Sequence, residues 1–357
     1  MNESGPRILI VSDIHLGALN SDLDQFSLFL NKIINGEFGD DLQALIILGD
    51  FLDLGTSVKR TLFIDEKITN ILTQLIEVKK KIHIIFVLGN HEIPVTSSLF
   101  SGNYDVKFKT RKEKFLKKFT SNIVEELFAS NMICQYIILS KWENESTLFL
   151  YDSQDQIYNH PIQTIKFNRL DLAENYKCLM LHGYQFESDA IRILVAPFWK
   201  SMISNQNIGI KEVYNYFWNV VIKEHRKIKP ITIEDMKSDL KILRQLSSEE
   251  IDAIFSNLST LEFNLIKLNM RVMRKYRNAR ESSYYIDGIE EFFEEAKCDF
   301  SLITHLIYGH SHVKGVSNET INNQQIVIIN SGSWEQSKSS YAEILYKGKI
   351  NLIFPNL

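Results

Sequence analysis

The stretch ALIILGDFLDLG, residues 44–55, places two aspartates directly after a run of five apolar residues. Such a run is typical of a buried strand. A buried strand that ends on carboxylates is unusual, because a negative charge without a positive neighbour is costly to remove from water. The fold must therefore bring positive charge to Asp50 and Asp53.

Strand-like and helix-like segments alternate around this stretch. RILIVSD (7–13) and IHIIFVLGN (82–90) are short apolar runs like residues 44–50, and apolar residues recur at helical spacing in 20–36 and 62–81. The order strand, helix, strand, helix, strand predicts an α/β layer with parallel neighbours. Further apolar runs predict the remaining strands, in residues 134–152, 177–183, 302–310, 324–334 and 341–354.

Residues 188–300 differ from the rest of the chain, because they contain helix signals and few strand signals. We predict a core made of residues 1–187 and 301–357, interrupted by a helical insertion or cap at 188–300. A basic segment, RVMRKYRNAR, lies within this insertion at residues 271–280.

The composition is that of an ordinary soluble globular protein, with 45% hydrophobic residues, 24% charged residues and a net charge of −4 over 357 residues. A charge so near neutral argues against wholesale binding to nucleic acid, although it permits a local basic patch. We find no signal peptide and no apolar run of transmembrane length, so we expect a cytoplasmic protein. Peripheral membrane contact and oligomeric state stay open. The three cysteines are widely spaced and fit core residues in a reducing compartment: Cys134, Cys178 and Cys298.

Side chains that could bind a metal ion or take part in catalysis follow five of the predicted strands. Such positions are where sites in α/β sheets gather. On an extended backbone, the two-residue spacing of Asp13 and His15, and of His310 and His312, points both side chains of a pair to one side. The candidates are Asp13 and His15, Asp50 and Asp53, Asn90 and His91, His182, and His310 and His312.

Each of these residues also has an ordinary structural explanation. A single aspartate after a strand is usually a turn or helix cap, and a single histidine is usually a core or surface residue. Their joint placement after successive strands instead favours a metal site. Oxygen and imidazole ligands without thiolate suit divalent Mn, Fe, Zn or Co. The ligands are too many for one ion, so we expect two divalent ions that share Asp50.

The motifs DIH, GDFLD, GNHE, HG and GHSH occur in this order between residues 13 and 312. As a set they resemble the calcineurin-like metallophosphoesterases, whose pattern is D-x-H, G-D-x-x-D, G-N-H-[DE], H and G-H-x-H. The resemblance implies an α/β fold of two mixed β-sheets packed face to face with flanking helices. It also implies two ligand sets: Asp13, His15, Asp50 and His312 for one metal, and Asp50, Asn90, His182 and His310 for the other.

The same resemblance implies the chemistry. A hydroxide that bridges two metal ions attacks the phosphorus atom of a phosphodiester or pyrophosphate. His91 stays off the metals and protonates the leaving oxygen. Asp53 orients His91, or it is a turn or helix cap.

The substrate class follows from two leucines. Leu54 follows Asp53 and Leu88 precedes GNHE, where the protein Ser/Thr phosphatases carry arginines. Arginine forks usually grip phosphomonoester dianions, so we expect a phosphodiester or pyrophosphate instead. HGYQF (182–186) and NSGSW (330–334) are most similar to the UDP-diacylglucosamine pyrophosphohydrolase group. The alternatives are an SbcD-type DNA nuclease, with which the chain shares SDIHLG, and a non-catalytic scaffold. Binding to nucleic acid is not favoured.

Overall fold

The computed structural model describes residues 5–18, 21–51, 66–90, 132–151, 161–186, 288–289, 302–321, 323–334 and 339–355. The predicted catalytic residues His91 and Asp53 lie outside these ranges. So does the predicted insertion at 188–300, apart from residues 288 and 289. The proposed domain boundaries therefore stay a prediction.

The first β-sheet has six strands in the order β13-β12-β1-β2-β3-β4. Strands β1, β2 and β3 are parallel neighbours, as the alternation of strands and helices predicted. Strand β12 runs antiparallel to β1, so the sheet is mixed. The strands, in sheet order, are Ile350–Ile353, Tyr341–Leu345, Pro6–Val11, Ala44–Leu48, His83–Val87 and Ile133–Cys134.

The second β-sheet has seven strands in the order β10-β11-β9-β8-β5-β6-β7. Strands β8, β9 and β11 are parallel, and the outer strands are antiparallel. The fold is thus the expected α/β arrangement of two mixed sheets. The strands, in sheet order, are Gly315–Ile321, Gln324–Asn330, His305–Tyr308, Lys177–Leu181, Tyr136–Trp142, Glu145–Tyr151 and Gln163–Phe167.

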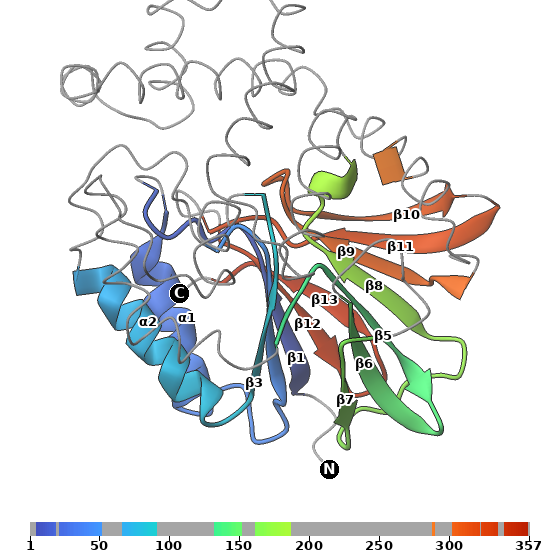
Figure 1. Cartoon of the computed structure of the whole chain (residues 1–357), viewed down its shortest axis with the longest axis horizontal. Coiled ribbons are helices and arrows are strands. Elements are labelled where there is room, and N and C mark those ends of the chain that lie inside the picture. The colour runs from blue at the N-terminus through green and yellow to red at the C-terminus, as the bar shows by residue number, and fades with distance from the viewer. Residues whose placement is uncertain are drawn as a thin grey trace, which may run out of the picture.

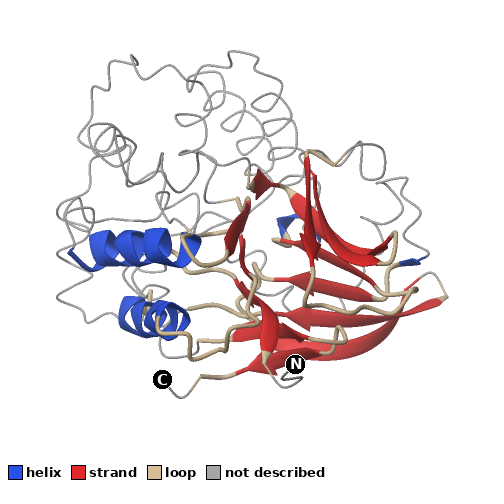
Figure 2. Cartoon of the chain, turned by 90° about the horizontal axis from the view of Figure 1, so that it is seen from below, coloured by secondary structure: helices blue, strands red, loops and turns tan. Residues whose placement is uncertain are grey.

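Two helices, α1 (Leu23–Ile34) and α2 (Glu66–Lys79), cover the outer face of the first sheet (Figures 1 and 2). The Asp22 side chain accepts a hydrogen bond from the Gln25 amide and caps the start of α1, which is a common role for aspartate. The apolar residues at helical spacing face the sheet, as predicted: Phe26, Phe29, Leu30 and Ile33. Neither described helix is long and apolar enough to cross a membrane.

The two sheets pack face to face around a shared apolar core. Side chains alternate along a strand, so Ile8 and Ile10 of β1 face the second sheet while Leu9 and Val11 face the helices. Strand β1 is therefore buried on both faces, and this explains its unbroken apolar sequence. Cys134 and Cys178 lie in the core between the sheets as thiols rather than in a disulfide, as predicted for them.

The outer face of the second sheet is covered by residues from distant parts of the chain. Phe186, at the end of the short 3-10 helix η4 (Tyr184–Phe186), and Ile289 belong to one buried cluster with this face. Gly288 lies so close to Phe186 that a side chain on Gly288 would overlap the Phe186 carbonyl. Residues 288 and 289, which belong to the predicted insertion, therefore lie against Phe186 beside strands β8 and β9.

Candidate metal centre

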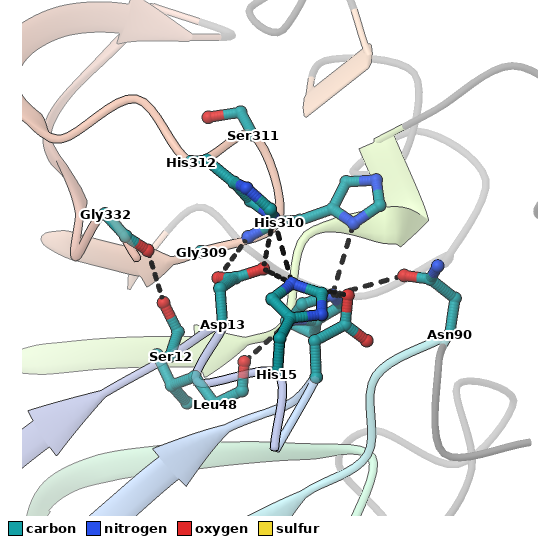
Figure 3. A network of polar contacts seen from close by, with 12 residues as sticks. Ser12, Asp13, His15, Leu48, Asn90, Gly309, His310, Ser311, His312 and Gly332 are labelled. Atoms are coloured by element: carbon teal, nitrogen blue, oxygen red, sulfur yellow. Dashed lines mark hydrogen bonds and ion pairs between the residues drawn. The ribbon is translucent and has the colours of Figure 1, made fainter. Parts of the chain in front are cut away.

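The predicted site residues that the structure describes lie together at one edge of both sheets. Strands β1, β2 and β3 of the first sheet and β8 and β9 of the second end at this edge (Figure 3). Each strand is followed by its predicted residues: Asp13 and His15 after β1, Asp50 after β2, Asn90 after β3, His182 after β8, and His310 and His312 after β9. His91 and Asp53 are outside the described residues.

Five candidate ligands have a left-handed rather than an extended backbone, so the extended backbone that we assumed for the D-x-H and H-x-H pairs is wrong. Asp13 and His15 still share one ligand group, whereas His310 and His312 belong to different groups. A left-handed residue other than glycine costs roughly 1–2 kcal/mol, and such strain clusters at functional sites. The surrounding structure must therefore hold these loops in place. The φ angles are 51° for Asp13, 52° for His15, 47° for Asp50, 65° for His310 and 58° for His312.

Asp13, His15 and His312 form the first group of candidate ligands. The Oδ1 atom of Asp13 lies 3.2 Å from the Nε2 atom of His312 and 3.7 Å from that of His15. The two Nε2 atoms are 3.1 Å apart. Asp13 and His15 are buried, whereas the His312 side chain is 24% exposed and is the most accessible ligand of this group.

Asp50, His182 and His310 form the second group. The Nε2 atom of His182 lies 3.2 Å from Oδ2 of Asp50 and 3.2 Å from Nδ1 of His310. Oδ1 of Asn90 is also 3.2 Å from this Nε2 atom. The groups are adjacent, because Oδ2 of Asp50 is 3.8 Å from Nε2 of His15 in the first group.

The donor atoms fit two divalent metal ions. Two ligands at about 2.0–2.1 Å from a shared ion, at ordinary coordination angles, stand roughly 3.0–3.4 Å apart. The facing ring nitrogens of His15 and His312, at 3.1 Å, and of His182 and His310, at 3.2 Å, have this separation. Each group offers one carboxylate and two imidazoles, which are ligands for divalent transition metals.

Without metal, the negative charge of the carboxylates is balanced by positive charge on the imidazoles. Burial raises the pKa of Asp13, but the charges of His182 and His312 and hydrogen bonds from His15 and His312 hold it well below its ordinary value. Burial lowers the pKa of His182, but Asp50 and Asp13 raise it to about 9. Asp13 and Asp50 thus meet positive charge at this edge, from the His182 imidazolium in the metal-free protein.

Close packing fixes the candidate ligands. The Nδ1 atom of His182 donates to the Leu48 carbonyl at 2.7 Å, which leaves Nε2 facing Asp50. A Cβ atom on Gly49 would lie 2.6 Å from the His182 ring. A Cβ atom on Gly309 would overlap the Asp13 carboxylate. Both glycines therefore permit an approach that no other residue allows.

Sequence reasoning missed buried polar residues that hold the ligand loops. Ser12 and Ser331 share a hydrogen bond of 2.7 Å, and Asn330 donates to Ser311 between the two histidines of GHSH. A signal was present in the sequence: Asn330 and Ser331 directly follow the apolar run of β11, just as the candidate ligands follow theirs.

Comparison with known proteins places the chain in a family. The model of the calcineurin-like phosphoesterase family matches residues 6–314, a range that contains all five motifs. The chain therefore belongs to the calcineurin-like phosphoesterase family, and it is a metal-dependent phosphoester hydrolase. No curated protein matches the chain significantly. Among solved structures, a dimetal phosphatase from Danio rerio is 11% identical, with a TM-score of 0.40 over 98% of this chain and 99% of that one.

Proposed function

We propose that this enzyme hydrolyses a phosphodiester or a pyrophosphate at a centre of two divalent metal ions. Asp13, His15, Asp50 and His312 hold one ion. Asp50, Asn90, His182 and His310 hold the other. The position of Asp50 carries this assignment: its Oδ2 atom lies 3.2 Å from His182 of one group and 3.8 Å from His15 of the other.

The residues of the chain hold the ions, orient the ligands and transfer protons. The bound ions supply Lewis-acid activation of a water and neutralise charge on the phosphoryl oxygens. The Leu48 carbonyl fixes the His182 tautomer, so that Nε2 is the ligand atom. His91 protonates the leaving oxygen and Asp53 orients His91, or caps a turn or helix. Both roles rest on the GNHE and GDFLD motifs.

The sequence supports a diester or pyrophosphate over a monoester, because Leu54 and Leu88 stand where the protein Ser/Thr phosphatases carry arginines. Among the residues that the structure describes, the arginines are Arg7 and Arg169. Arg7 stands at the opposite end of β1 from Asp13, and it pairs with Asp41 at 3.2 Å. Arg169 pairs with the same carboxylate. Neither is placed to grip a phosphomonoester dianion, which usually needs an arginine fork.

The ligand atoms also bear on the metal. Carboxylate and amide oxygens with imidazole nitrogens, and no thiolate, suit Mn, Fe, Zn or Co. We propose Mn²⁺ as the working metal, because oxygen ligands make up a large share of the set. We further propose that the enzyme acts in the cytoplasm, in line with the buried thiols of Cys134 and Cys178, which are not in a disulfide.

A substrate panel tests this proposal. Chelated enzyme reloaded with Mn²⁺ is assayed on bis(p-nitrophenyl) phosphate, p-nitrophenyl phosphate, a nucleotide-sugar pyrophosphate, and single- and double-stranded DNA. The nucleotide-sugar pyrophosphate is included because of the HGYQF and NSGSW motifs. We expect the highest kcat/KM on a diester or pyrophosphate of small size. A preference for the monoester would contradict the proposed substrate class, and a preference for DNA would establish the nuclease instead.

A further inference from the structure

Residues 330–334, which begin at the last residue of β11, lie between the two loops that carry most of the candidate ligands. The Ser331 amide donates to the Tyr308 carbonyl at 2.8 Å, just before the GHSH loop. The Trp334 amide donates to the Asp13 carbonyl at 3.1 Å. Figure 3 shows the Ser12 hydroxyl bonded to the carbonyl of Gly332, at 2.8 Å. This segment therefore contacts both loops through the backbone.

The Asn330 side chain reaches the GHSH loop itself. Its Nδ2 atom donates to the Ser311 hydroxyl at 2.5 Å and to the Gly309 carbonyl at 3.4 Å. Its Oδ1 atom accepts from the Gly332 amide at 2.9 Å. Only this orientation of the amide satisfies all three contacts, because Gly309 offers an acceptor and Gly332 a donor. Asn330 is 5% exposed, so water does not compete for these bonds.

The loop that Asn330 contacts needs such support. Ser311 lies between His310 and His312, which have φ angles of 65° and 58°. Two left-handed residues in one loop persist only when their surroundings fix them. The His310 amide donates to Oδ2 of Asp13 at 2.8 Å, so the loop also aligns a carboxylate of the first group. Asn330 bonds to Gly309 and Ser311 on either side of His310.

We propose that Asn330 is a positioning residue for the metal ligands His310 and His312, acting through the Ser311 hydroxyl. This proposal rests on the ligand set given under the proposed function. Asn330 touches neither substrate nor metal. It keeps the two imidazoles aimed at Asp13 and His182, so that little reorganisation is needed when the ions bind. Residues that orient ligands in this way typically contribute about 10–100-fold to metal affinity.

Metal titration of three variants tests the proposal. Asn330→Ala, Ser311→Ala and the double variant are chelated, and their Mn²⁺ affinity is measured by equilibrium dialysis beside the wild type. We expect each single variant to bind Mn²⁺ about 10–100-fold more weakly. We expect the double variant to be no worse than the weaker single variant, because both changes remove one shared bond. The melting temperature of the metal-free protein separates ligand positioning from general destabilisation.

Asn351→Ala is the matched control. Its side chain donates to Glu343 at 3.0 Å, between β13 and β12 and away from the ligand loops. It should keep the wild-type affinity. If Asn330→Ala does not fold, Ser311→Ala removes the same bond with the loss of one oxygen atom.

Each outcome decides the matter. The role of Asn330 would be overturned if the single variants bound Mn²⁺ within about threefold of the wild-type affinity. It would also be overturned if the loss of affinity in the double variant were the sum of the two single losses. If the variants behave in one of these ways while the wild type binds two ions, the role of Asn330 fails but the proposed ligand set stands. If the wild type binds no ion, the proposed ligand set fails, and this inference fails with it.

Discussion

The Nδ1 atom of His182 lies 2.7 Å from the carbonyl oxygen of Leu48, the last residue of β2. A carbonyl oxygen only accepts, so this contact places a proton on Nδ1. The other ring nitrogen faces Asp50, two residues beyond Leu48. Strand β2 of the first sheet thus supplies a candidate metal ligand and also orients a second one from the other sheet.

The charge on His182 predicts how the stability of the metal-free protein changes with pH. Burial lowers the pKa of His182, but Asp50 and Asp13 raise it to about 9, above the ordinary value of 6.5. Because the folded-state pKa is raised, this stabilisation is fully present below pH 6.5 and is lost as the pH rises through about 9.

Thermal unfolding of chelated protein between pH 6 and pH 9.5 measures this effect. The melting temperature of the wild type should fall as the pH rises through this range, and that of His182→Gln should fall less. His83→Gln is the control, because His83 is exposed at the start of β3 and should leave the wild-type slope unchanged. Equal slopes in the wild type and His182→Gln would show that Asp50 and Asp13 do not stabilise a charged His182.

Substitution of two glycines that have the same φ angle distinguishes the effect of crowding at the site from the effect of backbone strain. Gly49 and Gly36 both have φ of 74°. A Cβ atom at Gly49 would lie 2.6 Å from the His182 ring, whereas one at Gly36 would meet nothing within 4 Å. Gly36→Ala should therefore destabilise the fold by only about 1–2 kcal/mol. Gly49→Ala should introduce the same strain and also displace His182, and it should therefore lower metal affinity and activity at least about tenfold.

Denaturant unfolding of the metal-free variants and Mn²⁺ titration of the same samples measure the two contributions. The strain is common to both variants, so the difference between them reports the contact with His182. Equal metal affinity in Gly49→Ala and Gly36→Ala would mean that the position of His182 does not govern metal binding.

The proposed acid can be tested without knowledge of its geometry. His91→Ala should keep both metal ions but slow the hydrolysis of diesters with poor leaving groups by about 10²–10⁴-fold. Nitrophenolate is a good leaving group that needs little protonation, so nitrophenyl diesters should lose much less. The kcat of wild type and variant on a series of aryl and alkyl diesters gives the comparison. An equal loss on both kinds of substrate would rule out His91 as the acid.

The layout of the site could be predicted from the sequence because it follows from strand direction. Parallel strands bring their carboxyl ends to one edge, so residues that follow β1, β2 and β3 must lie near one another. The sequence also predicted strands within residues 134–152, and the structure pairs β5 and β6 there as an antiparallel hairpin. Its turn residues Glu143 and Asn144 have φ angles of 49° and 67°, which are the left-handed values that two-residue hairpins prefer.

Other features depend on contacts that a linear pattern does not encode. Strand β10, GVSNETI, has a mostly polar sequence and an exposed pattern, and it forms by pairing with β11 along its whole length. The left-handed backbone of Asp13 and His310 depends on neighbours that are distant in the sequence. The same is true of Asn330, whose role is visible only once β11 lies beside the GHSH loop.

The position of Asp50 between the two ligand groups makes Asp50→Asn the most direct test of the dinuclear centre. The change keeps the shape of the side chain and removes its charge. Asp41→Asn is the control, because Asp41 pairs with Arg7 and Arg169, away from the ligand groups. The measurement is the metal content per chain after reconstitution with Mn²⁺, with activity on bis(p-nitrophenyl) phosphate recorded on the same samples. We expect two ions and full activity in the wild type and Asp41→Asn, and one ion or none with no activity in Asp50→Asn. Two ions per chain and wild-type activity in Asp50→Asn would contradict a centre in which Asp50 serves both metals.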